Sequence, residues 1–392
     1  MAKPLSPATI ATVKATIPAL QAHGFDIVKA MYARLFRIPE VAMLFNASHQ
    51  AGGDAQPKAL TGAILAYAQN IENPGVLAAA IERITQKHVS LQILPEHYPH
   101  VADALLGAIG DVLGEAATPD VLNAWGEAYW FLADVLIARE AQAYQDIAAQ
   151  PGGWTGWRRF TVADRHVESE QITSFILRPV DGGAVMAHRP GQYLAFDIAI
   201  PGQGSHRRNY SISSAPNKDH YRITVKRDRL VSSWLHDAAV PGTELNVAAP
   251  AEDFFLQDDS TRPLVLLSGG VGLTPMLSIL AALPKERRKD VTWIHATHNG
   301  RSLVQGKEIR EMAGRSAVFF ESPDPHEAEG VSHEVTGRVT PEWLAANTPV
   351  ADADFYICGP KPFMAMAIHG LEAAGAKRVY HEFFGPAEDL AA

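Results

Sequence analysis

The stretch AQPGGW at residues 149–154 constrains the fold more than any other feature, because the sequence pattern changes across it. Adjacent Pro and Gly residues interrupt both helices and strands. Residues 1–148 are rich in Ala and Leu and have apolar residues at helical spacing, whereas short alternating runs follow this stretch. With 392 residues the chain is also too long for one hydrophobic core. We therefore predict an all-α domain at 1–148, a linker at 149–154 and further domains beyond.

The first block contains clear helix signals. One helix face is predicted from residues at intervals of three and four: Leu77, Ile81, Ile84, His88 and Leu91. Thr118 stands where an N-cap is expected, and Pro119 follows at the first helical position. Strand signals are absent from this block, which supports the all-α prediction.

Two further patterns follow the linker. From 155 to 260, the runs QYLAFDIAI, HYRITVKR and ELNVAAP alternate in polarity and are separated by DGG, RPGQ, IPGQGS and VPGT. This pattern is typical of an antiparallel β-barrel or sandwich. From 261 to 392, the strand-like runs LVLLSGG, VTWIHATHN, AVFFES, DFYICGP and RVYHEFFG alternate with helical stretches. That alternation predicts an α/β domain with a doubly wound parallel sheet.

Charge and cysteine content exclude several classes of protein. The formal net charge is −9, from 34 basic and 43 acidic residues, and no polybasic run is present. This balance argues against nucleic acid or an anionic membrane as a partner. The single cysteine, Cys358, excludes an intrachain disulfide, an iron–sulfur cluster and a Cys-rich zinc site. No apolar run approaches the roughly 20 residues of a membrane span, so we expect a soluble cytoplasmic protein without integral membrane association.

Two glycine-rich turns in the last block indicate a nucleotide site. In LVLLSGGVGLTPML, the glycines Gly269, Gly270 and Gly272 let the backbone approach a pyrophosphate, and Pro275 opens a helix. The spacing differs from G-x-G-x-x-G, and such a turn alone is often a plain connector. YICGPKPFM at 356–364 repeats the design at a later strand end. Two such strand ends in one sheet favour a nucleotide crevice.

The stretch RRNYSISSAP in the β-block places Arg208, Tyr210 and Ser211 together. Arg can bind phosphate as a fork, Tyr can pack on an aromatic ring, and Ser can bond a ring nitrogen. In isolation these residues also fit an exposed strand with mixed polar side chains.

These three motifs, in this order, resemble the ferredoxin–NADP reductase family over about residues 155–392. The resemblance implies FAD on the barrel and NAD(P)H on the last domain, with Arg208 on the flavin pyrophosphate, Tyr210 on the ring system and Ser211 near N5. It implies further FAD contacts at Tyr193, Asn209, Val231, Ser232 and Ser233. The implied nucleotide contacts are Gly270, Val271, Gly272, Leu273, Thr274, Pro275, Cys358, Gly359 and Pro360. The stretch HEFFGP would close the flavin site with Glu382, Phe383, Phe384, Gly385 and Pro386, of which Glu382 would tune the flavin potential.

Such a reductase needs an electron acceptor, and the helical block could hold a b-type haem with His88 as iron ligand. A lone His at helical spacing is more often a packed core residue. Glu140, however, lies in an otherwise apolar helix, where a charge is costly without a partner. Tyr98, beyond Pro95, could complete a hydrogen-bond relay to His88. The presence of Glu140 thus favours His88 as a metal ligand whose ring is oriented by a carboxylate.

The stretches MYARLF, LFN, YAQNIEN, QKHVS, PEHY and NAWGEAY are similar to the globin domain of the flavohaemoglobins, so the resemblance spans essentially the whole chain. It implies that His88 is the proximal ligand of haem b, oriented by Glu140 and Tyr98. It also implies distal roles, in which Tyr32 and Gln56 donate hydrogen bonds to O₂, and Phe45 wedges the haem. Lys87 and Glu382 would lie near the boundary between haem and flavin and adjust their potentials.

Three departures from the family pattern concern single residues or short segments. Phe383 stands where the family often has Cys, and the VKRDRLVSSWLH connection is shorter than usual. Pro57 fixes Gln56 at a helix start, which weakens its expected distal contact.

The resemblance implies a nitric oxide dioxygenase, in which electrons pass from NAD(P)H to FAD and on to haem, with O₂ and NO as substrates, in a self-contained monomer. The alternatives are a haem-linked reductase for peroxides or other acceptors, and an O₂-binding or sensing globin. The choice between NADH and NADPH stays open, because Arg301 could reach a 2′-phosphate or face solvent.

Overall fold

The computed structural model describes residues 3–42, 44, 55–251, 254–257, 260–382 and 384, with only the backbone of residues 55 and 56. Its contacts divide the chain into two compact units. One unit holds the helical part up to Ala149 together with Ser205–Arg207, and the other holds Gln150–Gly204 and Arg208–Phe384. The two units are described separately.

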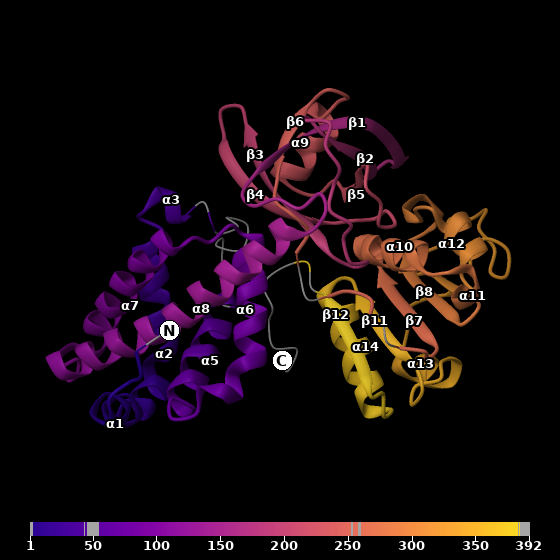
Figure 1. The fold of residues 1–392 in the computed structure, drawn as a ribbon. Coiled ribbons are helices and arrows are strands. Elements are labelled where there is room, and N and C mark those ends of the chain that lie inside the picture. The colour runs from indigo at the N-terminus through magenta and orange to yellow at the C-terminus, as the bar shows by residue number, and fades with distance from the viewer. Residues whose placement is uncertain are drawn as a thin grey trace. The chain divides into compact units, whose positions relative to one another are not determined.

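In the first unit, the described residues up to Ala149 form helices and the turns between them, as the sequence predicts (Figure 1). Its described α-helices are α1 (Pro7–Ala15), α2 (Ile17–Leu35), α3 (Pro39–Ala42), α5 (Ala55–Gln69), α6 (Ala78–Ser90), α7 (Tyr98–Leu113) and α8 (Pro119–Ala149). Short 3-10 turns at Pro74–Leu77, Pro95–His97 and Gly114–Ala116 connect several of them. Its core is apolar: Ile27, Met31 and Leu35 on α2 are buried together with Leu105 and Ile109 on α7.

Helix ends follow local chemistry. The predicted N-cap of α8 is confirmed, because the Thr118 hydroxyl accepts a hydrogen bond from the Val121 N–H at 3.3 Å and Pro119 opens the helix. Helix α6 is shorter than the predicted apolar face. Leu77 belongs to the preceding 3-10 turn, and Leu91 forms the C-cap. The left-handed φ of +56° at Gln92 then turns the chain out of the helix.

The second unit begins with an antiparallel sheet. Its strands are β1 (Arg158–Ser169), β2 (Ile172–Pro179), β3 (Tyr193–Ile200), β4 (Gly204–Ser211), β5 (Tyr221–Lys226) and β6 (Glu244–Val247), with helix α9 (Leu230–Ala238) after β5. The strand order is β4-β3-β6-β1-β2-β5. Just after β4, Ile212 bridges Ile223 of β5, so the two ends of the sheet meet and form the predicted barrel. Buried aromatic rings, including Phe160, Phe175 and Phe196, fill its interior.

A six-stranded parallel sheet follows, as predicted. Its strands are β7 (Leu264–Gly269), β8 (Val291–Thr297), β9 (Arg315–Phe320), β10 (Val335–Thr336), β11 (Asp354–Cys358) and β12 (Arg378–Glu382). The helices between them are α10 (Leu273–Ala282), α11 (Lys285–Arg288), α12 (Gly306–Met312), α13 (Pro341–Asn347) and α14 (Lys361–Ala373). The order β10-β9-β8-β7-β11-β12 reverses direction between β7 and β11. Ligands of doubly wound sheets bind at such a switch point, beyond the carboxyl ends of the strands.

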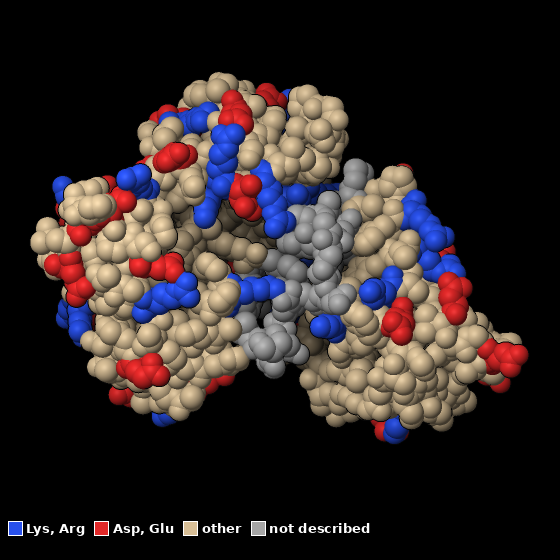
Figure 2. All heavy atoms as spheres, turned by 180° about the vertical axis from the view of Figure 1, so that it is seen from behind, with Lys and Arg blue, Asp and Glu red and all other residues tan. Residues whose placement is uncertain are grey.

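Two observations concern the described surface and helices. None of the described helices combines the length and the apolar character needed to cross a bilayer. On the face drawn in Figure 2, basic and acidic side chains lie interspersed. This mixture agrees with the modest net charge of −9.

Because two histidines of the second unit are buried, we expect the folded protein to lose stability in acid. Burial lowers the pKa of His188 and of His295 from 6.5 to about 4. In the unfolded chain both titrate near 6.5, so between about pH 6.5 and 4 the unfolded state binds protons that the native state does not. The free energy of unfolding therefore keeps the full contribution of the neutral histidines above pH 6.5. Below pH 6.5 it falls by up to about 1.4 kcal/mol per pH unit for each histidine. Urea unfolding at pH 7.5 and pH 5 should show this loss. The loss should be smaller in His295→Asn, and an equal loss in both proteins would contradict the prediction.

Candidate functional site

The structure brings together three groups predicted from the sequence, each on a different helix of the first unit. His88 lies near the end of α6, Tyr98 begins α7, and Glu140 lies in α8. The His88 Nδ1 is 2.7 Å from Glu140 Oε1 and 3.2 Å from the Tyr98 hydroxyl. The Tyr98 hydroxyl donates to Glu140 Oε1 at 2.6 Å. Glu140 is only 2% exposed, so these two partners supply the hydrogen bonds that its buried oxygen needs.

The positions of the protons follow from these contacts. Burial, reinforced by the hydrogen bond to Glu140, raises the pKa of Tyr98 far above its usual range. The Tyr98 hydroxyl therefore stays protonated and acts as the hydrogen-bond donor to Glu140. A carboxylate oxygen can only accept, and therefore the His88 Nδ1 carries the proton that it shares with Glu140. The Nε2 atom of a neutral imidazole is then left with a lone pair. Among the described residues, no side chain forms a hydrogen bond to the His88 Nε2.

This arrangement fits a haem iron. A metal-binding His commonly donates its second ring N–H to a carboxylate, which fixes the ring orientation and makes the ligand nitrogen more basic. Here the His88 side chain is 31% exposed, so its free nitrogen is accessible while its other nitrogen is anchored. His88 therefore has the chemistry of a proximal haem ligand, with Glu140 and Tyr98 as its support.

Tyr129 is a further supporting residue, whose role no sequence motif marked. Its hydroxyl donates to the backbone oxygen of Tyr98 at 2.7 Å and thereby holds the start of α7 against α8. Tyr129 is part of the stretch NAWGEAY, and it precedes Glu140 by three helical turns on the same helix. That spacing puts Tyr129 and Glu140 on one face of α8 and could have revealed the link.

Of the other residues predicted to contact haem, Tyr32 and Lys87 are described by the structure. Tyr32 lies on α2, where its ring stacks on Phe36 with centroids 5.5 Å apart. Lys87, next to the candidate ligand, is exposed. Phe45 and the side chain of Gln56 lie outside the described residues.

The predicted flavin motif lies at the end of β4, next to the barrel closure. Arg208 is partly buried, and this burial lowers the pKa of its guanidinium. The Tyr210 ring packs edge-on against Phe196 with centroids 5.6 Å apart, while Asn209 on the opposite face of the strand is exposed. Ser211 is buried at the strand end. The motif therefore offers a cation, an aromatic face and a hydroxyl along one edge of the barrel.

Two more predicted flavin-binding segments take regular positions. Tyr193 is buried at the start of β3. Val231, Ser232 and Ser233 form the first turn of α9, as the predicted helix start requires. The Ser232 hydroxyl accepts hydrogen bonds from the backbone N–H groups of residues 228 and 229, both at 3.0 Å. That hydroxyl stabilises the turn itself. An anion such as a phosphate would therefore bind to the backbone N–H groups at the start of the helix.

The glycine-rich turn after β7 fits a pyrophosphate. Gly270 has a left-handed φ of +52°, and no heavy atom lies within 4 Å of the place that a β-carbon would take, so the space beside it is open. The turn leads into α10 through Leu273, Thr274 and Pro275, with Val271 between the glycines. A nucleotide phosphate can thus approach the backbone at a helix start.

The two predicted nucleotide turns touch each other. A β-carbon on Gly272 would lie 2.2 Å from the carbonyl oxygen of Cys358, so only glycine fits there. A β-carbon on Gly359 would lie 3.1 Å from the Gly269 nitrogen. Cys358 is fully buried and Pro360 is exposed at the start of α14. Both turns therefore belong to the switch point between β7 and β11.

The C-terminal segment is described only in part. Glu382 ends β12 and pairs in register with Cys358 of β11. Burial first, and then the Glu382 charge, raises the pKa of the Cys358 thiol. Phe384 is 48% exposed, while Phe383, Gly385 and Pro386 lie outside the described residues.

Arg301, the candidate for a 2′-phosphate contact, has a partner in the protein. Its Nε lies 2.8 Å from Asp324 Oδ2, although its side chain is 72% exposed. Asp324 would compete with a 2′-phosphate for this guanidinium. This contact weakens the argument for NADPH that the sequence left open.

Comparisons with known proteins agree with this architecture. The globin family model matches residues 28–136, and the oxidoreductase NAD-binding domain matches residues 266–369. A "flavohemoprotein" of Xylella fastidiosa is 49% identical, with 99% of each chain covered, and one of Deinococcus radiodurans is 44% identical, with 99% of this chain and 98% of the relative covered.

Solved structures give the same result. The crystal structure of flavohaemoglobin from Malassezia yamatoensis, with bound FAD and haem, has a TM-score of 0.82 at 25% identity and covers 98% of this chain and 100% of that one. The FAD/NAD-binding domain of nitric oxide dioxygenase from Vibrio cholerae has a TM-score of 0.54 at 36% identity, with 58% of this chain and 99% of that chain covered. Full-length identity of this order, together with the order of the domains, shows that the chain belongs to the flavohaemoglobin family.

Proposed function

We propose that the protein is an NAD(P)H-dependent nitric oxide dioxygenase that removes NO. Two NO, two O₂ and one NAD(P)H give two nitrate ions, one NAD(P)⁺ and one proton. FAD supplies the conversion of a two-electron donor into single electrons, and haem b supplies the iron at which O₂ and NO react. The protein residues bind and orient these groups and stabilise their charges.

The observation that carries the proposal is the His88–Glu140–Tyr98 cluster. Two hydrogen bonds end on one Glu140 oxygen, at 2.7 Å from His88 and 2.6 Å from Tyr98. The bond from His88 gives its imidazole partly anionic character, and such a ligand increases the electron density on iron. A globin that only stores O₂ has no need of this feature, nor of two intact nucleotide turns in the same chain.

The remaining roles follow from the chemistry of each side chain. Tyr32 and Gln56 are our candidates for hydrogen-bond donors on the distal side, and Phe45 for the haem wedge. The flavin would take Arg208 at its phosphates and Tyr210 and Ser211 at its ring. The nicotinamide nucleotide would lie on the turns that contain Gly272 and Gly359.

The organisation of the chain is part of the proposal. We assign residues 1–148 to the haem domain, 149–154 to a linker, 155–260 to the FAD domain and 261–392 to the NAD(P) domain. All cofactors would then be carried by one chain, which fits a monomer with self-contained electron transfer in the cytoplasm.

The function can be tested by measuring NADH consumption and nitrate with the purified protein. We expect NADH oxidation in the presence of O₂ to accelerate on addition of NO, with two nitrate ions formed per additional NADH. Anaerobic NO should not give nitrate. If peroxide or another acceptor accelerates NADH oxidation and NO does not, the protein is a reductase of another kind and the proposal is wrong.

A further inference from the structure

A buried histidine links the barrel to the first helix of the parallel-sheet domain. His188 lies in the connection between β2 and β3 and is 3% exposed. Its Nε2 is 2.9 Å from the Ser278 hydroxyl on α10 and 3.1 Å from the backbone oxygen of Ser214. The Ser278 hydroxyl itself donates to this Ser214 oxygen at 2.8 Å. The side chains of His188 and Ser278 thus meet at the carbonyl of Ser214, and these three hydrogen-bonded groups form a polar bridge between the barrel and α10.

The direction of these hydrogen bonds is fixed by the carbonyl. The Ser214 oxygen can only accept, so the Ser278 hydroxyl donates its proton to it. The His188 Nε2–H is then shared between the Ser278 hydroxyl oxygen at 2.9 Å and the Ser214 oxygen at 3.1 Å. Burial lowers the pKa of His188 to about 4, and the ring therefore stays neutral with its proton on Nε2 at physiological pH. The bridge is thus maintained at physiological pH.

On the barrel side, the bridge is attached rigidly to the flavin motif. Ser214 follows the candidate flavin residue Ser211 by three positions. The intervening backbone is held on both sides, by the bond from Ile212 N to Gln192 O at 3.0 Å and from Ser213 N to Arg222 O at 2.8 Å. A displacement of Ser214 would therefore be transmitted to Ser211.

On the other side, the bridge is attached to the nucleotide turn. Ser278 is fully buried and lies one helical turn beyond Thr274 in α10. The Thr274 hydroxyl donates to the Val271 oxygen at 3.0 Å and ties the helix start to the glycine-rich turn. Helix α10 thus connects the bridge rigidly to the predicted pyrophosphate site.

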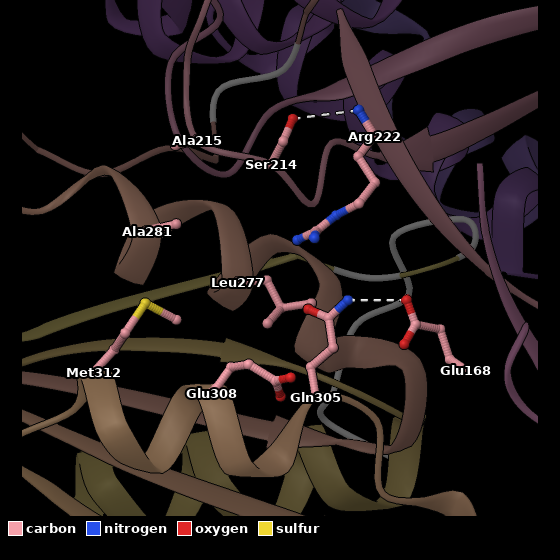
Figure 3. A pocket seen from close by; sticks show the side chains of 9 residues that line it. All are labelled: Glu168, Ser214, Ala215, Arg222, Leu277, Ala281, Gln305, Glu308 and Met312. Atoms are coloured by element: carbon pink, nitrogen blue, oxygen red, sulfur yellow. Dashed lines mark hydrogen bonds between the residues drawn. The ribbon is translucent and has the colours of Figure 1, made fainter. Parts of the chain in front are cut away.

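A cavity next to the bridge reduces the packing between barrel and α10, so the hydrogen bonds of the bridge matter more for their relative position. In Figure 3 the Arg222 side chain of the barrel points towards Leu277 of α10 and Gln305 next to α12. These residues and Ser214 line a cavity of about 350 Å³. Close packing is interrupted at this place, although Ile172 of the barrel and Leu277 of α10 belong to one buried apolar cluster. On the far side of the cavity, Gln305 Nε2 donates to Glu168 Oε1 at 3.0 Å. Discrete polar bridges therefore add to the apolar packing around Ile172 in setting the relative position of barrel and helix.

We propose that His188 is a positioning residue for hydride transfer, which holds α10 and its nucleotide turn at the right distance from the flavin-binding strand. In that step the C–H bond at C4 of the dihydronicotinamide breaks, an N–H bond forms at flavin N5, and both electrons move with the hydride. The nucleotide is thereby oxidised and the flavin is reduced by two electrons. The inference rests on the FAD and NAD(P)H binding in the proposed function and is independent of the NO reaction.

The test compares two variants of His188 by anaerobic stopped-flow measurement of flavin reduction at increasing NADH. In His188→Phe the ring volume stays and the hydrogen bonds are lost, so the limiting rate constant should fall roughly 10- to 100-fold, as for a misplaced reactant pair. The NADH concentration at half-saturation and the flavin content should stay within about twofold of the wild type. His188→Gln carries an amide N–H at nearly the distance of Nε2 and should restore the rate to within a few-fold.

Ser278→Ala removes both hydrogen bonds that α10 makes to His188 and Ser214 and should slow flavin reduction at least as much as His188→Phe does. Unchanged rates, or an equal loss in the Gln and Phe variants, would overturn the proposal, as would loss of flavin from both His188→Phe and Ser278→Ala. Failure of the NO assay with normal flavin reduction in the wild type would concern the proposed function and leave this inference standing.

Discussion

His88→Ala should purify without haem while it retains FAD. The substitution removes the nitrogen lone pair that we assign to the iron, and nothing else in the cluster can replace it, because Glu140 and Tyr98 are already hydrogen-bonded to each other at 2.6 Å. The Soret band should be reduced by at least about tenfold relative to flavin absorbance, since loss of the ligand removes most of the haem affinity. Anaerobic reduction of flavin by NADH should continue, because the flavin and nucleotide turns lie in the other unit.

Two companion variants distinguish ligand loss from misfolding. His23→Ala removes an exposed histidine of α2 and should keep the full Soret band. Glu140→Gln keeps the shape of the side chain and the iron ligand, so haem should be retained with an altered iron–histidine stretching frequency. A full Soret band in His88→Ala would show that His88 is not the ligand.

Gly272→Ala should abolish most NADH-dependent activity without removing either prosthetic group. The new methyl group would meet the Cys358 carbonyl at 2.2 Å. That carbonyl cannot move away easily, because β11 is paired in parallel with β7 on one side and β12 on the other. The nucleotide turn must then shift, and we expect flavin reduction by NADH to slow by roughly 100-fold.

Reduction of the Gly272→Ala flavin by dithionite should remain normal, which separates a damaged nucleotide turn from a damaged flavin. Gly126→Ala in α8 is the matched control, because its methyl group would meet only Leu106 at 3.7 Å. If Gly272→Ala reacted with NADH at the wild-type rate, the turn would not be the nucleotide site.

Local signals predicted much of the architecture. Alternating runs such as QYLAFDIAI became strands because the period of two puts one face into the barrel. Thr118 caps α8 because its hydroxyl reaches a free N–H of the first turn at 3.3 Å. The hydrogen bond between His88 and Glu140 could also be anticipated, since a carboxylate buried in an apolar helix requires a donor.

Contacts that depend on tertiary packing could not be predicted in this way. His188 and Ser278 are 90 positions apart, and neither has a local pattern that marks it as half of a bridge. The ends of α6 also differ from the prediction, because a 3-10 turn replaces the first helical residues and a left-handed Gln92 ends the helix. An apolar period continues through such ends without showing where the hydrogen bonding changes.

The burial of Cys358 has a consequence for a protein that handles nitrogen oxides. Its thiol is fully buried, and its pKa is raised, so the reactive thiolate is scarce and out of reach of alkylating and nitrosating reagents in the native state. Modification requires the sheet to open between β7 and β12, which flank the residue on both sides. Because the chain has no other cysteine, the rate of its alkylation reports directly how often this part of the molecule opens.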